Sequence, residues 1–126
     1  MRARILVIED NPANLDLMLY LIGAFGHIAV AARDGQEGLR AAAQVKPDLI
    51  LCDIHLPKID GYEVVRRLKS DPDCCSIPTV AVTALAMVGD CERVLRAGFD
   101  GCLTKPIDPE AFMNQINGFV NCGRSQ

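Results

Sequence analysis

The sequence predicts an α/β protein with a doubly wound (βα)5 fold, in which helices cover both faces of one parallel five-stranded sheet. Short apolar runs of strand length alternate with segments of helical period, and turn or capping residues separate them. The links are short, and no internal repeat or low-complexity stretch interrupts the alternation. Five such units predict three layers, with the sheet in the middle.

The first unit carries the clearest signals. Residues 5–8 (ILVI) form a short, unbroken and β-branched run, which is typical of a strand buried on both faces. Asn11 is a plausible N-cap, and Pro12 suits the first position of a helix. One helix face is then predicted by i, i+3, i+4 and i+7 spacing of Leu15, Met18, Leu19 and Ile22, and Gly26 closes the helix.

Four more strands and four more helices follow by the same reasoning. The strands are expected at residues 28–31, 48–53, 77–83 and 102–103. Asp34 caps the second helix and Pro47 stops it. The later helices are predicted by three apolar sets: Tyr62, Val65 and Leu68; Val88, Cys91 and Leu95, ended by Gly98; and Phe112, Ile116, Phe119 and Val120.

Length and charge limit the class of protein. The 126 residues fit a single domain over 1–126, and half of them are hydrophobic. The net charge of −3 and the scattered Lys and Arg residues argue against a nucleic-acid surface. No apolar run approaches the ~20 residues that cross a bilayer, and the first run ends too early for a signal peptide. We therefore expect a cytoplasmic protein that binds neither nucleic acid nor membrane.

The six cysteines indicate neither a disulfide framework nor a zinc site. The chain is rich in core residues, lacks a C-x-x-C pair, and holds its two histidines far from zinc-like spacing. Cys52 and Cys102 lie in apolar runs and are interpreted as small core residues. Adjacent Cys74 and Cys75 lie in a polar connection and are candidates for oxidation, although a regulatory redox role is not expected.

Polar residues stand where four of the predicted strands end. Glu9 and Asp10 follow the first strand, Asp53 ends the third, Thr83 ends the fourth, and Lys105 follows the fifth. The carboxyl ends of parallel strands lie at one edge of the sheet, so these side chains are expected to meet in one crevice. Three carboxylates there repel one another unless a cation lies among them, and oxygen ligands without histidine favour Mg²⁺.

This combination predicts phosphoryl chemistry. A carboxylate facing Mg²⁺ can attack a phosphoryl group and form an acyl phosphate. Lys105 and the Thr83 hydroxyl can bind the other phosphoryl oxygens. Each element alone is most simply a turn or a cap, but the conjunction at successive strand ends is hard to explain that way.

The sequence resembles the receiver domain of CheY-like response regulators in two-component signalling, over essentially the whole chain. The resemblance implies a flavodoxin-like three-layer sandwich with strand order 2-1-3-4-5. The segments that carry it are residues 5–11 (ILVIEDN), 47–57 (PDLILCDIHLP), 60–61 (DG), 82–84 (VTA) and 103–106 (LTKP).

The resemblance also assigns the metal and the acceptor. Asp53 would accept a phosphoryl group from a histidine kinase or a histidine phosphotransfer protein. Asp10 would ligate Mg²⁺ directly, Glu9 would act mainly through a bound water, and the backbone carbonyl of His55 would complete the set. Mn²⁺ is expected to substitute for Mg²⁺. The domain would signal, with no enzymatic activity beyond self-catalysed phosphoryl transfer and autodephosphorylation.

Signal output is the second implication. Lys105 would pair with the phosphoryl group, Thr83 would swing towards it, and a cis peptide is expected at Lys105-Pro106. An unidentified downstream protein would bind the face of the fourth helix, fifth strand and fifth helix, near residues 88–96 and 102–119.

The family often has an aromatic residue where this chain has Cys102. We therefore expect a modest rearrangement, carried by Thr83 and residues 84–88. His55 and Leu85 occupy positions that tune acyl-phosphate hydrolysis in the family.

Three alternatives remain open. A flavodoxin-like FMN binder would need a Ser-, Thr- or Gly-rich phosphate loop where this chain has Glu9-Asp10. A Mg²⁺-dependent phosphatase with an Asp nucleophile would carry a D-x-D pattern on its first strand, whereas Asp53 lies on the third strand and is followed by Ile54 and His55. A receiver excised from a hybrid histidine kinase or larger regulator would look the same; Met1 and the short tail at 121–126 favour a free-standing protein.

Overall fold

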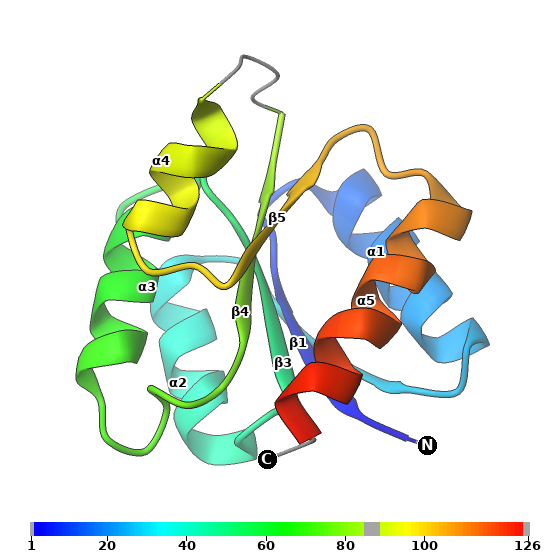
Figure 1. Cartoon of the computed structure of the whole chain (residues 1–126), viewed down its shortest axis with the longest axis horizontal. Helices are drawn as coiled ribbons and strands as arrows, with labels where there is room; N and C mark the ends of the chain where they lie inside the picture. Colours follow the sequence, from blue (N-terminus) through cyan, green and yellow to red (C-terminus); the bar gives the residue numbers. More distant parts are fainter. Residues whose placement is uncertain (1, 85–88, 125–126) are drawn as a thin grey trace.

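A computed structural model describes residues 2–84 and 89–124, with side chains through residue 120. Five parallel strands form one sheet in the order β2-β1-β3-β4-β5 (Figure 1). The strands are β1 (Arg4–Ile8), β2 (Ile28–Ala32), β3 (Leu49–Asp53), β4 (Thr79–Thr83) and β5 (Gly101–Thr104). This arrangement confirms the predicted fold class and strand order.

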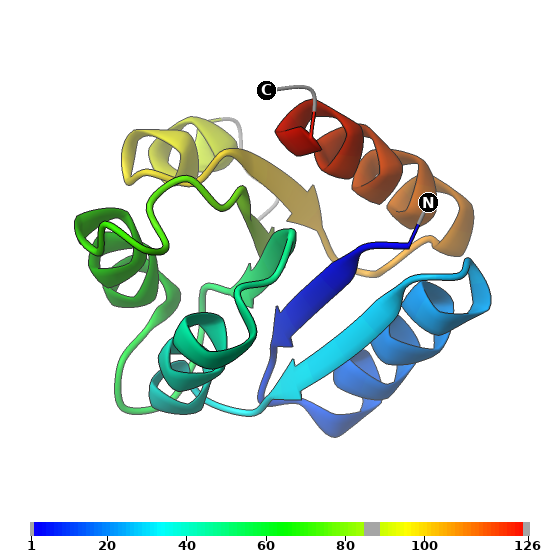
Figure 2. The same cartoon turned by 90° about the horizontal axis from the view of Figure 1, so that it is seen from below.

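Helices cover both faces of the sheet, as Figure 2 shows. α1 and α5 lie on one face, and α2, α3 and α4 lie on the other. The helices are α1 (Pro12–Ala24), α2 (Gly35–Val45), α3 (Gly61–Ser70), α4 (Asp90–Arg96) and α5 (Pro109–Arg124). None of the helices in the described part of the chain is long and apolar enough to cross a membrane.

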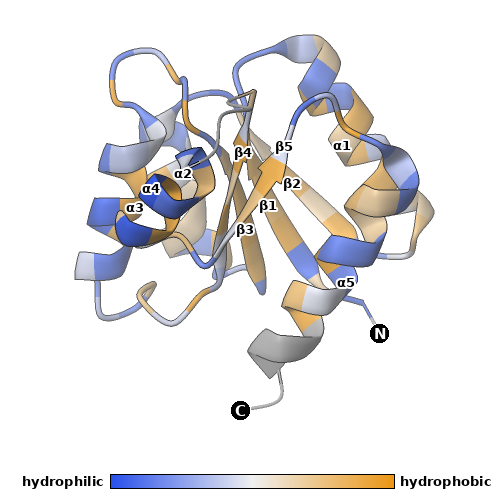
Figure 3. Cartoon of the chain, turned by 45° about the horizontal axis from the view of Figure 1, so that its top comes forward, coloured by the Kyte–Doolittle hydropathy of each residue, from blue (hydrophilic) through white to orange (hydrophobic). Residues whose placement is uncertain are grey.

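The sheet separates two hydrophobic cores, because alternate residues of a strand face opposite sides. Val7 packs in the core beneath α1 and α5, together with Met18 and Ile116. Leu6 packs in the core beneath α2, α3 and α4, together with Val65. Figure 3 shows the apolar sheet between the more polar outer surfaces of the helices. Burial on both faces explains why the strand runs are unbroken rather than alternating.

Side-chain caps begin three of the helices, and two of these caps, Asn11 and Asp34, are at predicted residues. The Asn11 side chain accepts the Asn14 N–H at 3.1 Å, and Pro12 begins α1. The Asp34 carboxylate accepts the Glu37 N–H at 2.8 Å, which begins α2. α3 begins with a cap from Asp60, whose carboxylate accepts the Glu63 N–H at 3.0 Å. These caps set the paths by which the chain leaves β1, β2 and β3.

The predicted glycines follow α1 and α4, but the inward face of α4 differs from the predicted one. Gly26 and Gly98 follow α1 and α4 with φ of 88° and 119°, a region that suits glycine. In α4 the spacing placed Leu95 with Cys91 on the inward face. Leu95 is 48% exposed, whereas Val94 is fully buried. The interpretation of Leu95 was wrong because a helix of only two turns is oriented by the sheet it packs on, not by a three-residue pattern.

The histidine and cysteines outside the predicted site have structural surroundings. His27 precedes β2, and its Nδ1 accepts the Ala3 N–H at 3.0 Å while its Nε2 lies 3.2 Å from the Asn117 side-chain oxygen. This supports the interpretation of His27 as a strand-edge residue. Cys52 is buried as predicted, and Cys102 is only partly buried.

Candidate functional site

Three carboxylates meet at the carboxyl edge of the sheet. β1 and β3 are neighbours with Ile8 opposite Cys52, so the residues after these two, Glu9 and Asp53, project side by side. Glu9, Asp10 and Asp53 each place a carboxylate oxygen within 4.8 Å of the others. Glu9 is fully buried, Asp53 is 4% exposed, and Asp10 is open to solvent. The convergence predicted from the strand ends is therefore present.

Lys105 reaches this cluster from the far side of β4. Its ammonium Nζ lies 2.9 Å from Glu9 Oε1 and 3.2 Å from Asp53 Oδ2. The Lys105 backbone N–H donates to the Thr83 carbonyl at 2.8 Å, which fixes the start of the loop after β5. The expected cis peptide at Lys105-Pro106 is present. Burial alone would lower the pKa of Lys105, but the adjoining Glu9 and Asp53 carboxylates raise it above its ordinary value.

Glu9 is the most perturbed acid of the cluster. The pKa of its carboxyl is raised to about 7, chiefly by burial and also by the neighbouring Asp53 carboxyl, while Lys105 opposes the shift. Glu9 Oε2 accepts the Asn11 N–H at 3.2 Å. Oε1 is buried beside Lys105 at ion-pair distance, yet accepts no well-directed hydrogen bond from the residues that the structure describes. The Lys105 ammonium offsets the charge of this oxygen, and a proton or a water can supply the directed hydrogen bond.

Asp53 is held by the loop that follows it. Its Oδ1 accepts the His55 N–H at 3.1 Å, while Oδ2 faces Lys105. Gly61 begins α3 and donates its N–H to the Ile54 carbonyl at 2.8 Å. A Cβ on Gly61 would lie 2.5 Å from the Asp53 carbonyl oxygen and 2.7 Å from the Ile54 Cα. The close return of this backbone therefore requires glycine, a role that the sequence pattern Asp60-Gly61 signals but does not explain.

Thr83 ends β4, between the strands that carry Asp53 and Lys105. It is fully buried and lies opposite Thr104 in the sheet. The side chain of His55 is exposed beyond the acceptor. Leu85, expected to tune hydrolysis, and Val88, expected in the fourth helix, lie outside the described residues, as do residues 86 and 87.

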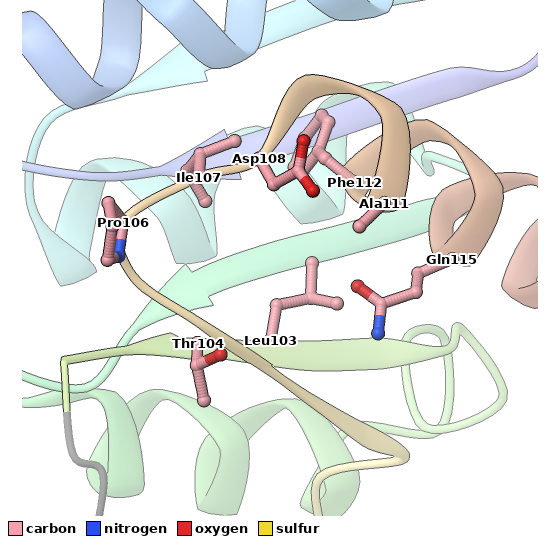
Figure 4. A pocket seen from close by; sticks show the side chains of 8 residues that line it. All are labelled: Leu103, Thr104, Pro106, Ile107, Asp108, Ala111, Phe112 and Gln115. Atoms are coloured by element: carbon pink, nitrogen blue, oxygen red, sulfur yellow. The ribbon is translucent and has the colours of Figure 1, made fainter.

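A small pocket lies beside this site, under the loop that joins β5 to α5 (Figure 4). Its apolar lining includes Leu103, Ile107 and Phe112. Leu103 and Phe112 also belong to the core beneath α1 and α5. Burial of these two side chains anchors both ends of the loop that carries Lys105.

The donor set fits a hard divalent cation. All three side-chain donors are carboxylate oxygens, and no histidine or thiol takes part in this cluster. One lysine faces two of the three acids, so the cluster retains negative charge when all are ionised. The buried Oε1 of Glu9 adds an acceptor that a metal-bound water can satisfy. Mg²⁺ is the common biological cation that prefers such ligands.

The fold and the cluster together define a doubly wound α/β domain with a carboxylate centre at the switch point of its sheet. The family model described as "Response regulator receiver domain" matches residues 5–117. The polar-differentiation response regulator DivK of Brucella anthropi is 40% identical over 116 residues, which cover 92% of this chain and 94% of DivK. DivK of Brucella ovis is 40% identical over 120 residues, covering 95% of this chain and 98% of the relative. The chain therefore belongs to the response regulator receiver family, the signalling domains of two-component systems that interact with histidine kinases and effectors.

Solved structures agree with this membership. The receiver domain of a signal transduction histidine kinase from Syntrophus aciditrophicus is 29% identical with a TM-score of 0.88, covering 98% of this chain and 94% of that one. The receiver domain of a sensor histidine kinase from Pseudomonas aeruginosa PAO1 is 30% identical with a TM-score of 0.87, covering 96% and 99%. That domain was crystallised with a magnesium ion coordinated in its active site cleft.

Proposed function

We propose that Asp53 accepts a phosphoryl group from the phosphohistidine of a histidine kinase or histidine phosphotransfer protein, in a reaction that requires a divalent cation. The observation that carries this proposal is the position of the Asp53 carboxylate. It belongs to the acidic cluster, and its Oδ2 lies 3.2 Å from Lys105 Nζ. An acceptor must face both a cation site and a group that neutralises phosphoryl charge, and Asp53 does so.

Asp10, Asp53 and the backbone carbonyl of His55 would hold Mg²⁺, and Glu9 would act mainly through a metal-bound water. Bound there, the ion supplies positive charge that offsets the carboxylates and a phosphoryl oxygen. Mn²⁺ prefers the same oxygen ligands and is expected to substitute. The support for this assignment is the all-oxygen donor set and the close approach of the three carboxylates, whose oxygens lie within 4.8 Å of one another.

Backbone and side-chain groups of this chain then carry out the transfer. The His55 N–H holds Asp53 Oδ1, so the carboxylate is oriented before the donor arrives. A carboxylate oxygen of Asp53 attacks phosphorus, the donor N–P bond breaks, and its electron pair stays on the donor imidazole. The Lys105 ammonium then pairs with one phosphoryl oxygen as negative charge develops there. The Thr83 hydroxyl turns to donate a hydrogen bond to another phosphoryl oxygen.

All of these groups come from this chain, which is why we propose self-catalysed transfer. A small phosphodonor is then sufficient, with no kinase present. Attack of water on the acyl phosphate would reverse the modification. His55 lies at the exposed edge of the site and would influence how water enters.

Output would pass through protein contacts on α4, β5 and α5 and not through nucleic acid, which is consistent with the net charge of −3. Thr83 links the site to this face, since its carbonyl accepts the N–H of Lys105 at the end of β5. Cys102 is small, so its inward or outward placement changes little buried area. The rearrangement would be modest and centred on Thr83 and residues 84–88, of which 85–88 lie outside the described residues.

Intact-mass analysis of the whole chain with acetyl phosphate tests the acceptor. We expect one phosphoryl adduct in Mg²⁺ or Mn²⁺ and none after chelation by EDTA. Asp53→Asn should lose the adduct. Asp60→Asn is the matched control because Asp60 is a nearby exposed carboxylate and asparagine keeps the α3 cap. Normal labelling of Asp53→Asn would overturn the assignment.

A further inference from the structure

The loop between β3 and α3, residues 54–60, holds the proposed acceptor in place. The His55 N–H donates to Asp53 Oδ1 at 3.1 Å. The Ile54 carbonyl accepts the Gly61 N–H at 2.8 Å, which closes the loop onto the start of α3. A displacement of this loop therefore moves Asp53 and the His55 carbonyl, the atom that we propose as a metal ligand.

Ile59 joins this loop to the core beneath α2, α3 and α4. Its side chain is half-buried and packs against that core. The preceding residue, Lys58, is exposed and has φ of 68°, in the left-handed region that residues other than glycine rarely adopt. The chain therefore turns sharply at Lys58, between the exposed surface and the half-buried Ile59.

Ile59 packs on Gly35, the first residue of α2. A Cβ at Gly35 would lie 2.5 Å from Ile59 Cγ1, 2.9 Å from Ile59 Cδ1 and 2.8 Å from Val64 Cγ2 in α3. Gly35 is not in the left-handed region, so its backbone conformation is open to other residues, and alanine is the better helix former. Glycine is therefore required here because Ile59 and Val64 fill the place of its Cβ.

α2 has a fixed position on the sheet. The Asp34 side chain caps its first turn. One turn farther along, a Cβ at Gly38 would collide with the Ile8 side chain, so α2 lies directly on β1. α2 also packs beside α3 on the same face of the sheet (Figure 2). Because the helix is held in this way, added volume at Gly35 should displace Ile59 rather than α2.

We propose that Gly35 is a positioning residue for phosphoryl transfer, because its missing Cβ lets Ile59 set the position of the loop that carries His55. This inference rests on the proposed function, in which Asp53 and the His55 carbonyl have their roles. Cβ contacts below 3.0 Å essentially never occur, so an alanine must push Ile59 away by about 0.5 Å. Mg²⁺ demands near-ideal octahedral geometry and tolerates such a shift of a ligand poorly. Metal binding should therefore be weakened even where the fold is kept.

Titration of the full chain with Mg²⁺, without a phosphodonor, tests this role through the amide chemical shift of His55. Gly35→Ala should raise the Mg²⁺ dissociation constant about tenfold, as is typical when a group that orients a metal ligand is altered. At subsaturating Mg²⁺, the rate of Asp53 labelling by acetyl phosphate should fall with it. Gly23→Ala is the matched control, because a Cβ there meets nothing within 4 Å, and it should keep the wild-type affinity.

A second substitution separates positioning from general strain. Ile59→Ala removes Cγ1 and Cδ1, so the double variant Gly35→Ala/Ile59→Ala should bind Mg²⁺ more tightly than Gly35→Ala alone. Urea unfolding in EDTA establishes that each variant is folded under the conditions of the titration. If Gly35→Ala does not fold, the double variant decides. Recovery of the fold and of Mg²⁺ binding supports the inference, and no recovery overturns it.

Two further results overturn the inference. One is wild-type Mg²⁺ affinity in folded Gly35→Ala, which would mean that Ile59 changes rotamer without moving the loop. The other is a double variant that binds no better than Gly35→Ala, which would place the strain at Val64. In both cases the wild-type chain still forms the Asp53 adduct, so the proposed function stands. If the wild-type chain shows neither a Mg²⁺ response nor an adduct, the proposed function fails and this inference fails with it.

Discussion

The ammonium of Lys105 lies 2.9 Å from Oε1 of Glu9, a carboxylate that is wholly buried at the end of β1. The same ammonium also faces Asp53. One positive charge is therefore shared between two buried acids, and exposed Asp10 adds a third negative charge. Because of this excess negative charge, the stability of the protein should depend on pH, on added cations and on substitution of Glu9 or Lys105. Each dependence can be measured.

The stability of the metal-free protein should fall as pH rises. The pKa of Glu9 is 4.5 in an unstructured chain and about 7 in the fold, chiefly through burial. Between these values the folded state holds more protons than the unfolded state, so the stabilisation is complete below about pH 4.5 and is lost as pH rises through about 7. The slope has an upper limit of about 1.4 kcal/mol per pH unit for one proton.

Urea unfolding in EDTA at pH values from about 5 to about 8 measures this slope. Glu9→Gln keeps the shape of the side chain and removes its charge, so it should flatten the profile and stabilise the protein at the alkaline end. Glu37→Gln, an exposed acid in α2, is the control and should keep the slope. Equal slopes for wild type and Glu9→Gln would contradict the raised pKa.

Mg²⁺ should raise the melting temperature, because it binds the folded site and not the unfolded chain. The gain follows mass action and reaches about 2.7 kcal/mol at a hundredfold excess over the dissociation constant. Asp10→Asn should weaken this response. It should stabilise the metal-free protein only slightly, because Asp10 is exposed and its repulsion is screened. Thermal melts across a Mg²⁺ titration check both effects, and an unchanged Mg²⁺ response in Asp10→Asn would remove Asp10 from the metal set.

Lys105→Met should destabilise the protein at about pH 8 because it leaves Glu9 and Asp53 buried without a counter-charge. Removal of one partner from a buried ion pair costs about 3 kcal/mol. At about pH 5 the loss should be smaller, because protonated Glu9 no longer needs the lysine. Denaturant unfolding at both pH values gives the comparison. A loss independent of pH would indicate that Lys105 stabilises through packing alone.

Gly61→Ala should disturb the acceptor loop, because its Cβ would lie 2.5 Å from the Asp53 carbonyl oxygen. Overpacking against backbone costs about 1–3 kcal/mol, and the shift of Asp53 should slow its phosphorylation. Gly118→Ala is the matched control. A Cβ there meets nothing within 4 Å, so alanine in α5 should be neutral or stabilise by up to about 1 kcal/mol. Wild-type stability and labelling rate in Gly61→Ala would contradict the close approach.

Much of the fold could be predicted because it depends on local properties. The unbroken run at residues 5–8 indicated burial on both faces, and Asn11 and Asp34 marked helix starts by their capping chemistry. Leu95 shows where local patterns fail. Its spacing suited an inward face, but the packing of a short helix on β5 turned Val94 inward instead.

The sequence by itself determined which residues reach the carboxyl edge, because parallel strands align their ends and Asp53 and Lys105 follow apolar runs directly. Only the tertiary structure decided how these residues share charge and space. The raised pKa of Glu9 depends on burial, and the need for glycine at 61 arises because a Cβ there would lie 2.5 Å from the Asp53 carbonyl oxygen. These properties depend on contacts between segments that are far apart in the chain, and such contacts cannot be predicted from periodicity or motif spacing.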